Sequence, residues 1–129
     1  MKTYRQTICV DFDGVLHSYT SKFTAPGEIH DPPVPNALGW LEDMLDSRLN
    51  GGGYKYVVCI YSSRSVDPKG IVAMKSWLQE HGMPPSYIER IEFPTQKPVV
   101  WLTIDDRAIC FRGTFPSELE IDSFKAWNK

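Results

Sequence analysis

Three short segments of the chain are almost continuously apolar and rich in valine, isoleucine and aromatic residues: 7–10, 56–61 and 99–104. This composition is typical of β-strands. Because polar residues do not alternate with apolar ones, we expect strands that are buried on both faces, as in a parallel sheet. Shorter strands are predicted at 90–93 and 108–111.

Between the first two strands, leucines recur at helical spacing. Leu38, Leu41, Leu45 and Leu49 would share one face of a helix that runs from about 35 to 49, with a proline near its first position. An asparagine and three consecutive glycines follow and predict the end of this helix and a loop back to the sheet.

A second helix is predicted to begin at Asp67 as N-cap, with Pro68 at its first position, and to end at Gly82. Ser117 and Glu120 have the spacing of a capping box and predict a short C-terminal helix. Strands that alternate with helices are typical of an α/β domain. We therefore expect residues 1–129 to form a single three-layer Rossmann-like domain around a central, mostly parallel sheet.

Composition and charge further limit the class of protein that this chain can belong to. A length of 129 residues suits one domain, and a net charge of −2 provides no global attraction to nucleic acid or to an anionic membrane. No apolar stretch approaches the roughly 20 residues that span a bilayer. The first residues run directly into a predicted strand, so we expect no signal peptide and a cytoplasmic protein. The three cysteines, Cys9, Cys59 and Cys110, are expected to be buried thiols.

Polar residues directly follow the three main predicted strands. These are Asp11 and Asp13, then Ser62, then Asp105 and Asp106. In an open parallel sheet the binding crevice lies at the carboxyl ends of the strands, so these residues should converge on one edge. A single aspartate there often caps a turn. Two acidic pairs at two strand ends instead predict a divalent cation with oxygen ligands, and Mg²⁺ is the usual ion beside phosphates.

The same segments resemble the motifs of the haloacid dehalogenase (HAD) superfamily. DFDGVL (11–16) resembles motif I, and VVCIYSSR (57–64) resembles motif II, with Ser62 as its polar residue. QKPVVWLTIDD (96–106) resembles motifs III and IV, with Lys97, Asp105 and Asp106. The four motifs occur in the expected order between residues 7 and 107. The resemblance implies a HAD-like fold and a Mg²⁺-dependent phosphatase.

The resemblance also implies roles for these residues. Asp11 would attack phosphorus and form an aspartyl-phosphate, and Asp13 would act as general acid and base. Ser62 and Lys97 would bind the phosphoryl oxygens. The Mg²⁺ ligands would be Asp11, the main-chain carbonyl of Asp13, and at least one of the pair Asp105 and Asp106.

Four further residues are candidates for substrate binding. Ser63 is an alternative to Ser62, because the exact end of the strand is uncertain. Arg64 and Arg107 can each donate two hydrogen bonds to a phosphate, although a salt bridge to Asp67 or to the acidic pair Asp105 and Asp106 is an equal alternative. His17 lies just beyond motif I and is expected to contact substrate or the adjoining loop. Of the tryptophans, we expect Trp40, Trp77 and Trp101 in the core and Trp127 to dock the tail.

The chain has no room for the cap domain that many members of the superfamily carry. Residues 17–34 are rich in Pro, Thr and Ser without helical period, and predict a flap or loop. An open site suits a large phosphorylated substrate, such as a protein or, less favoured by the acidic balance, a nucleic-acid end. Alternatively, a neighbouring subunit of a homo-oligomer covers it over a small substrate. A non-catalytic Mg²⁺-binding module and a phosphotransferase are the alternative functions.

Overall fold

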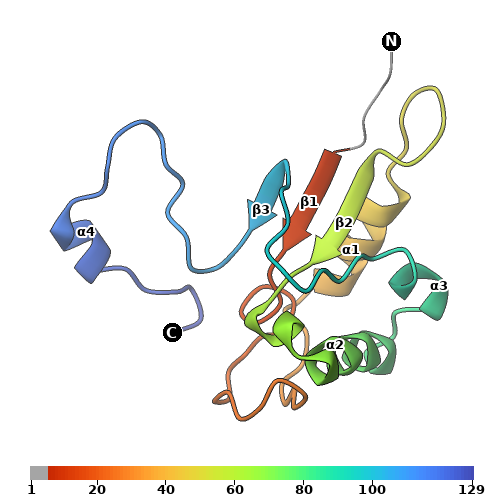
Figure 1. Cartoon of the computed structure of the whole chain (residues 1–129), viewed down its shortest axis with the longest axis horizontal. Coiled ribbons are helices and arrows are strands. Elements are labelled where there is room, and N and C mark those ends of the chain that lie inside the picture. Colours follow the sequence, from red (N-terminus) through yellow and green to blue (C-terminus); the bar gives the residue numbers. More distant parts are fainter. Residues whose placement is uncertain (1–5) are drawn as a thin grey trace.

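The computed structural model describes residues 6–129 (Figure 1). Residues 1–5, which bear on the expectation about a signal peptide, lie outside the described residues. No helix among residues 6–129 is long and apolar enough to cross a membrane. The elements are β1 (Gln6–Val10), α1 (Ala37–Asp46), β2 (Tyr56–Ile60), the 3₁₀ turn η1 (Ser63–Val66), α2 (Pro68–Glu80), α3 (Pro85–Ile88), β3 (Leu102–Ile104) and α4 (Glu118–Asp122).

The three strands form a small open parallel sheet in the order β2-β1-β3. Strands were predicted at all three positions, which is confirmed, although β3 begins three residues later than expected. The strand predicted at 90–93 is reduced to one parallel bridge, between Cys59 and Glu92. The strand predicted at 108–111 is wrong: these residues are exposed and lie outside the sheet. The structure is thus of the predicted α/β class.

One core holds the sheet and helices together. Ile8 and Val10 of β1 pair in register with Val58 and Ile60 of β2, and all four are buried on one face of the sheet. The same core includes Leu41 and Leu45 of α1 and Met74, Trp77 and Leu78 of α2. The chain reaches β3 through residues 93–101, where the structure has no helix. The helices of the β2–β3 connection, α2 and α3, come before this segment, and the three-layer arrangement stays a prediction.

The helices follow the predicted pattern with shorter bounds. α1 ends at Asp46 instead of 49, because Arg48 and Tyr54 form an antiparallel bridge that starts the turn back to β2. α2 begins as predicted, with the Asp67 carboxylate accepting a hydrogen bond from the Lys69 amide. α4 is likewise capped by Ser117. The one-turn helix α3 was not predicted, because Pro84 and Pro85 indicated only a break.

The loop 17–34 contains no helix or strand and is closed by a bridge between His17 and Pro33. It forms a flap of the predicted size beside α2.

The predictions for the tryptophans are confirmed in part. Trp77 is buried and Trp40 packs on the core, whereas Trp101 is 59% exposed because the segment before β3 is not covered. The Trp127 ring nitrogen donates a hydrogen bond to the Gly14 carbonyl, so Trp127 docks the tail as expected.

The cysteines give a test of this arrangement. Cys9 and Cys59 are buried in the sheet, whereas Cys110 is exposed, which corrects its predicted burial: the segment that carries it is not a strand. Burial raises the pKa of Cys59 to about 12. We expect iodoacetamide at pH 8 to add one label to the native protein and three after unfolding, as counted by mass spectrometry. The variant Cys110→Ser should take up no label while folded; a label on native Cys59 would contradict the fold.

Candidate functional site

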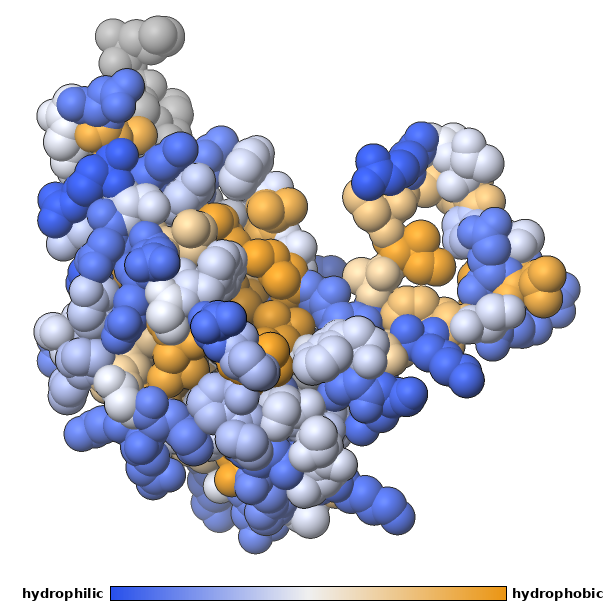
Figure 2. Space-filling model, turned by 180° about the vertical axis from the view of Figure 1, so that it is seen from behind, coloured by the Kyte–Doolittle hydropathy of each residue, from blue (hydrophilic) through white to orange (hydrophobic). Residues whose placement is uncertain are grey.

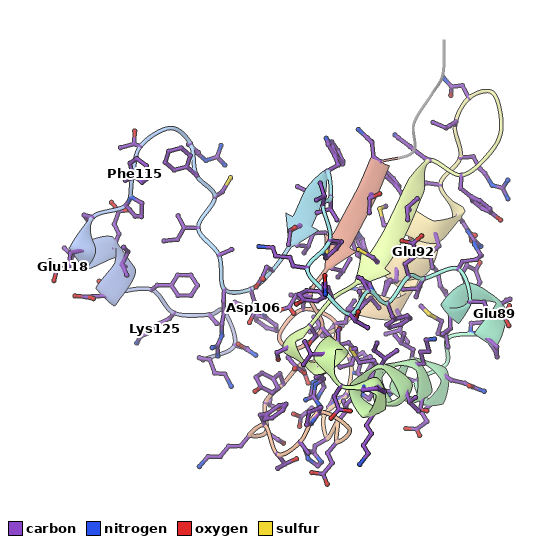
Figure 3. The ribbon with its side chains drawn as sticks, viewed as in Figure 1. Glu89, Glu92, Asp106, Phe115, Glu118 and Lys125 are labelled. Carbon is purple, nitrogen blue, oxygen red and sulfur yellow. The ribbon has the colours of Figure 1, made fainter. Side chains whose placement is uncertain are left out.

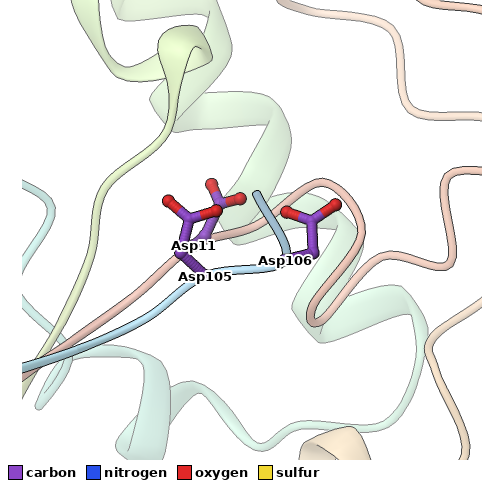
Figure 4. A group of neighbouring side chains, drawn as sticks. All are labelled: Asp11, Asp105 and Asp106. Carbon is purple, nitrogen blue, oxygen red and sulfur yellow. The ribbon is translucent and has the colours of Figure 1, made fainter. Parts of the chain in front are cut away.

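Three carboxylates meet where β1 and β3 end. Asp11 directly follows β1, and its amide donates to the carbonyl of Ile104, the last residue of β3, at 2.9 Å. Asp105 and Asp106 come next on that neighbouring strand. One oxygen from each carboxylate lies within 4.8 Å of the others (Figure 4). The parallel pairing of β1 with β3 thus brings together residues that are more than ninety positions apart.

The electrostatics of this cluster are unfavourable without a cation or a proton. Burial, together with the nearby Asp105 and Asp106 carboxylates, raises the pKa of Asp11 from its ordinary value of 3.8 to about 8. Like charges at this separation disfavour simultaneous ionisation. A divalent cation between the oxygens would remove this cost.

The donor set fits Mg²⁺. Mg²⁺ binds oxygen at about 2.0–2.1 Å in an octahedron, which places its ligand oxygens about 3–4 Å apart. The three carboxylates therefore need to close by only about 1 Å around the ion. Asp13 contributes no side-chain oxygen to this cluster. Its predicted contribution through the main-chain carbonyl stays a prediction.

The carboxylate of Asp13 points into a different set of contacts. The residue between the two aspartates, Phe12, is fully buried and packs edge-on against Trp77, with ring centroids 5.0 Å apart. Asp13 accepts from Arg64 Nε at 2.9 and 3.1 Å and lies 2.8 Å from His17 Nδ1. Burial alone would raise the pKa of Asp13, but His17 and Arg64 outweigh it and hold that pKa below the ordinary value.

Arg64 connects Asp13 to the flap. Its side chain is only 1% exposed, and its Nη1 donates to the carbonyls of Ala25, Pro26 and Glu28. Arg64 therefore forms a salt bridge in place of the predicted contact with a substrate phosphate, and its partner is Asp13, where Asp67 or the acidic pair was expected. The guanidinium fixes the flap to Asp13 and leaves no free face for substrate.

The side chain of His17 is also too deeply buried to contact a substrate. It is 1% exposed, and its Nε2 accepts a hydrogen bond from the Asp31 amide at 3.1 Å. Its predicted contact with the flap is confirmed, whereas contact with substrate is excluded by burial. Asp31 itself is held by the amide and hydroxyl of Ser21, at 2.8 and 2.7 Å. No sequence signal had indicated Asp31.

Two adjoining hollows open beside the carboxylates. The first, of about 230 Å³, is lined by Asp11, Ser62, Lys97 and other residues. Its lining also includes Cys9, Tyr61, Ser63, Pro98, Thr103 and Asp105. A lysine and hydroxyls therefore face the same space as the carboxylate cluster. Such a space accommodates a group that is both anionic and rich in acceptors, as a phosphate is.

The second hollow, of about 160 Å³, adjoins the first through Asp11, Ser62 and Ser63 and adds Arg107. Asp13, Tyr19 and Asp106 complete its lining. Arg107 thus lines a hollow beside the cluster, and its contact with substrate stays a prediction; Tyr19 was not predicted. Ser62 is buried and accepts from the Arg64 amide, so its own hydroxyl proton is left to donate; Ser63 is exposed.

Comparison with known protein families, with curated proteins and with solved structures gives no match to this chain.

Gly14 lies directly against the cluster and gives a sharp test of it. It has φ +85°, and a Cβ atom there would overlap the Asp106 carboxylate. We expect Gly14→Ala to displace Asp106 and to weaken Mg²⁺ binding at least about tenfold, measured by isothermal titration calorimetry. Gly52→Ala is the matched control, since Gly52 has φ +92° with open space around it. Both variants should lose about 1 kcal/mol of stability, and equal Mg²⁺ affinity in the two would contradict the assignment.

The raised pKa of Asp11 predicts a pH-dependent stability of the metal-free protein. Because the folded pKa lies above the ordinary 3.8, ionisation costs folding free energy as pH rises from about 4 to about 8. In EDTA, Asp11→Asn should therefore melt at a higher temperature than wild type at pH 8, and at the same temperature near pH 3. Thermal melts check this, with exposed Asp43→Asn as control. A lower melting temperature for Asp11→Asn at pH 8 would refute it.

Proposed function

We propose that the protein is a HAD-type, Mg²⁺-dependent phosphohydrolase that acts on phosphomonoesters through an aspartyl-phosphate on Asp11. The observation that carries the proposal is the cluster of Asp11, Asp105 and Asp106 beside a hollow lined by Lys97 and Ser62. A metal-holding cluster alone would suit many functions. A cationic and hydroxyl-lined space on the same carboxylate favours transfer of a phosphoryl group.

In the first step an oxygen of Asp11 attacks phosphorus, and the bond from phosphorus to the ester oxygen breaks. Lys97 and Ser62 hold the phosphoryl oxygens and offset the charge that develops there. When bound, Mg²⁺ screens the repulsion between carboxylate and phosphate. In the second step water attacks phosphorus, which frees the Asp11 carboxylate and releases inorganic phosphate.

The proton balance involves Asp13. Arg64 and His17 keep its carboxylate ionised at rest, the form that takes a proton from the attacking water. The leaving oxygen needs a proton in the first step. A phosphomonoester with a second pKa of about 6 can bring that proton when it binds as the monoanion. The proton then reaches the leaving oxygen through Asp13, and the carboxylate is restored.

The test is release of phosphate from p-nitrophenyl phosphate by wild-type protein, with Mg²⁺ and with excess EDTA. We expect release that needs Mg²⁺ and returns when Mg²⁺ is added back. Products that shift from phosphate to a phosphorylated alcohol when glycerol is added would identify a phosphotransferase. Mg²⁺ binding without turnover on this ester or on a panel of phosphorylated peptides, sugars and nucleotides would overturn the proposal in favour of a binding module.

A further inference from the structure

The chain beyond the site forms a long arm that leaves the body. The arm, residues 107–125, starts after Asp106, carries α4, and returns so that Trp127 and Asn128 hydrogen-bond to the Gly14 and Ser18 carbonyls (Figures 1 and 3). Between these anchored ends, no residue of the arm is buried. Its large apolar side chains are 42–83% exposed: Ile109, Phe111, Phe115, Leu119, Ile121 and Phe124.

These side chains gather along the arm. The rings of Phe111 and Phe115 contact one another, with centroids 4.9 Å apart. Figure 3 shows Phe115 and Glu118 far from the sheet. An apolar surface of this kind on a folded protein usually marks a contact with another protein.

The body carries an apolar surface that is also uncovered. In the β1–β3 register Ile8 lies beside Leu102, yet Ile8 is 4% exposed and Leu102 is 46% exposed. The helices that bury β1 and β2 therefore stop short of β3. Next to it lies a groove of about 440 Å³, lined almost entirely by apolar residues that include Leu16, Trp40 and Ile104. Figure 2, seen from behind, shows apolar residues exposed on the body, and the arm standing apart from it.

We propose that two copies of this chain form a symmetric dimer in which the arm of each packs into the groove beside β3 of the other. The two unpartnered apolar surfaces belong to the same chain, so a two-fold axis satisfies both at once. Because both ends of the arm are anchored at its own site, its apolar side chains reach outward to a second body. β3 is also an open strand edge, which such packing covers.

The size of the arm supports a stable dimer. Six large apolar side chains that are 42–83% exposed offer roughly 100 Å² apiece, or about 600 Å² per arm. Two arms and the two surfaces they cover exceed the roughly 1,200 Å² of total buried area at which specific interfaces begin. The arm carries three basic and three acidic residues, so net charge does not oppose the contact. The dimer would hold a second chain beside the carboxylate site.

The oligomeric state of the full chain tests the proposal independently of any phosphatase activity. By light scattering after size exclusion, we expect a dimer for wild type and a monomer for the variant Phe115→Glu with Leu119→Glu. Val72→Glu is the matched control, since Val72 is exposed to 64% on α2, away from both surfaces, and should leave the dimer intact. A wild-type monomer at about 50 μM, or a dimer unaffected by the arm variant, overturns the proposal.

A cross-link then tests which surfaces meet. Asn36 is exposed and lines the groove, while the arm carries the exposed thiol of Cys110. Wild-type chains mixed with chains that carry Asn36→Cys and Cys110→Ser should be joined by a short bis-maleimide between Cys110 of one and position 36 of the other. Peptide mass spectrometry identifies the linked pair. A dimeric sample without this adduct overturns the arrangement of arm in groove.

Discussion

Asp11→Asn is expected to slow phosphate release by at least about 10³-fold at saturating Mg²⁺, because the amide keeps the size of the side chain but removes the nucleophile. The residue lies at the point where the carboxylate cluster and the hollow lined by Lys97 meet. No other carboxylate of the cluster lines both hollows, so we expect no neighbour to replace it. Initial rates on p-nitrophenyl phosphate measure the effect.

The control for this variant is Asp43→Asn, which removes one carboxylate from the exposed side of α1 and should turn over as wild type does. The melting curves described above establish that Asp11→Asn is folded. If phosphate release by Asp11→Asn equals that of wild type, an aspartyl-phosphate on this residue is refuted, whatever the metal dependence.

Arg64→Met is expected to lower the free energy of unfolding by about 3–5 kcal/mol, since it removes one partner of a buried ion pair and leaves the other uncompensated. The Asp13 side chain is 13% exposed and loses its Nε donor. The carbonyls of Ala25, Pro26 and Glu28 lose their shared donor at the same time. Urea denaturation measures the difference in unfolding free energy between variant and wild type, with one shared value for its dependence on urea concentration.

Arg48→Met is the matched substitution at an exposed arginine, which lies over the Tyr54 ring at 4.1 Å. It should cost less than about 1 kcal/mol. Hydrogen exchange separates a general loss of stability from a local one: in Arg64→Met the flap amides should lose protection before those of β1. Equal stability of Arg64→Met and Arg48→Met would mean that the Arg64 network does not hold the flap.

The elements that the sequence predicted well are those with strong local signals. β1 and β2 are continuous apolar runs, and α2 begins at a capping aspartate followed by proline, so their positions needed no tertiary information. The one-turn helix α3 has too few residues for a period. The segment 108–111 has the composition of a strand, but nothing in the fold pairs with it. Composition reports what a segment is suited to, not whether a partner is present.

The residues of the site likewise fall into those that local sequence predicts and those whose partners depend on the tertiary structure. Polar residues after three apolar runs were sufficient to predict that Asp11, Asp105 and Asp106 share one edge, because parallel strands end on the same side of a sheet. The partner of the Arg64 guanidinium could not be predicted from the sequence in this way. Its ion pair with Asp13 spans 51 positions, and whether its guanidinium meets a phosphate, an aspartate or three carbonyls depends on where the flap lies.

By itself the sequence determined the α/β class, the main strands and helices, and the edge at which the acidic residues gather, because each rests on local periodicity or on the direction of strands. Only the tertiary structure decided which of these residues are free to meet a ligand. In the structure, His17 and Arg64 are buried in a hydrogen-bond network with Asp13, whereas Trp101 and Cys110 are exposed. Burial depends on which other segments cover a residue. Among residues 6–129, no segment of the same chain packs over the exposed side of β3.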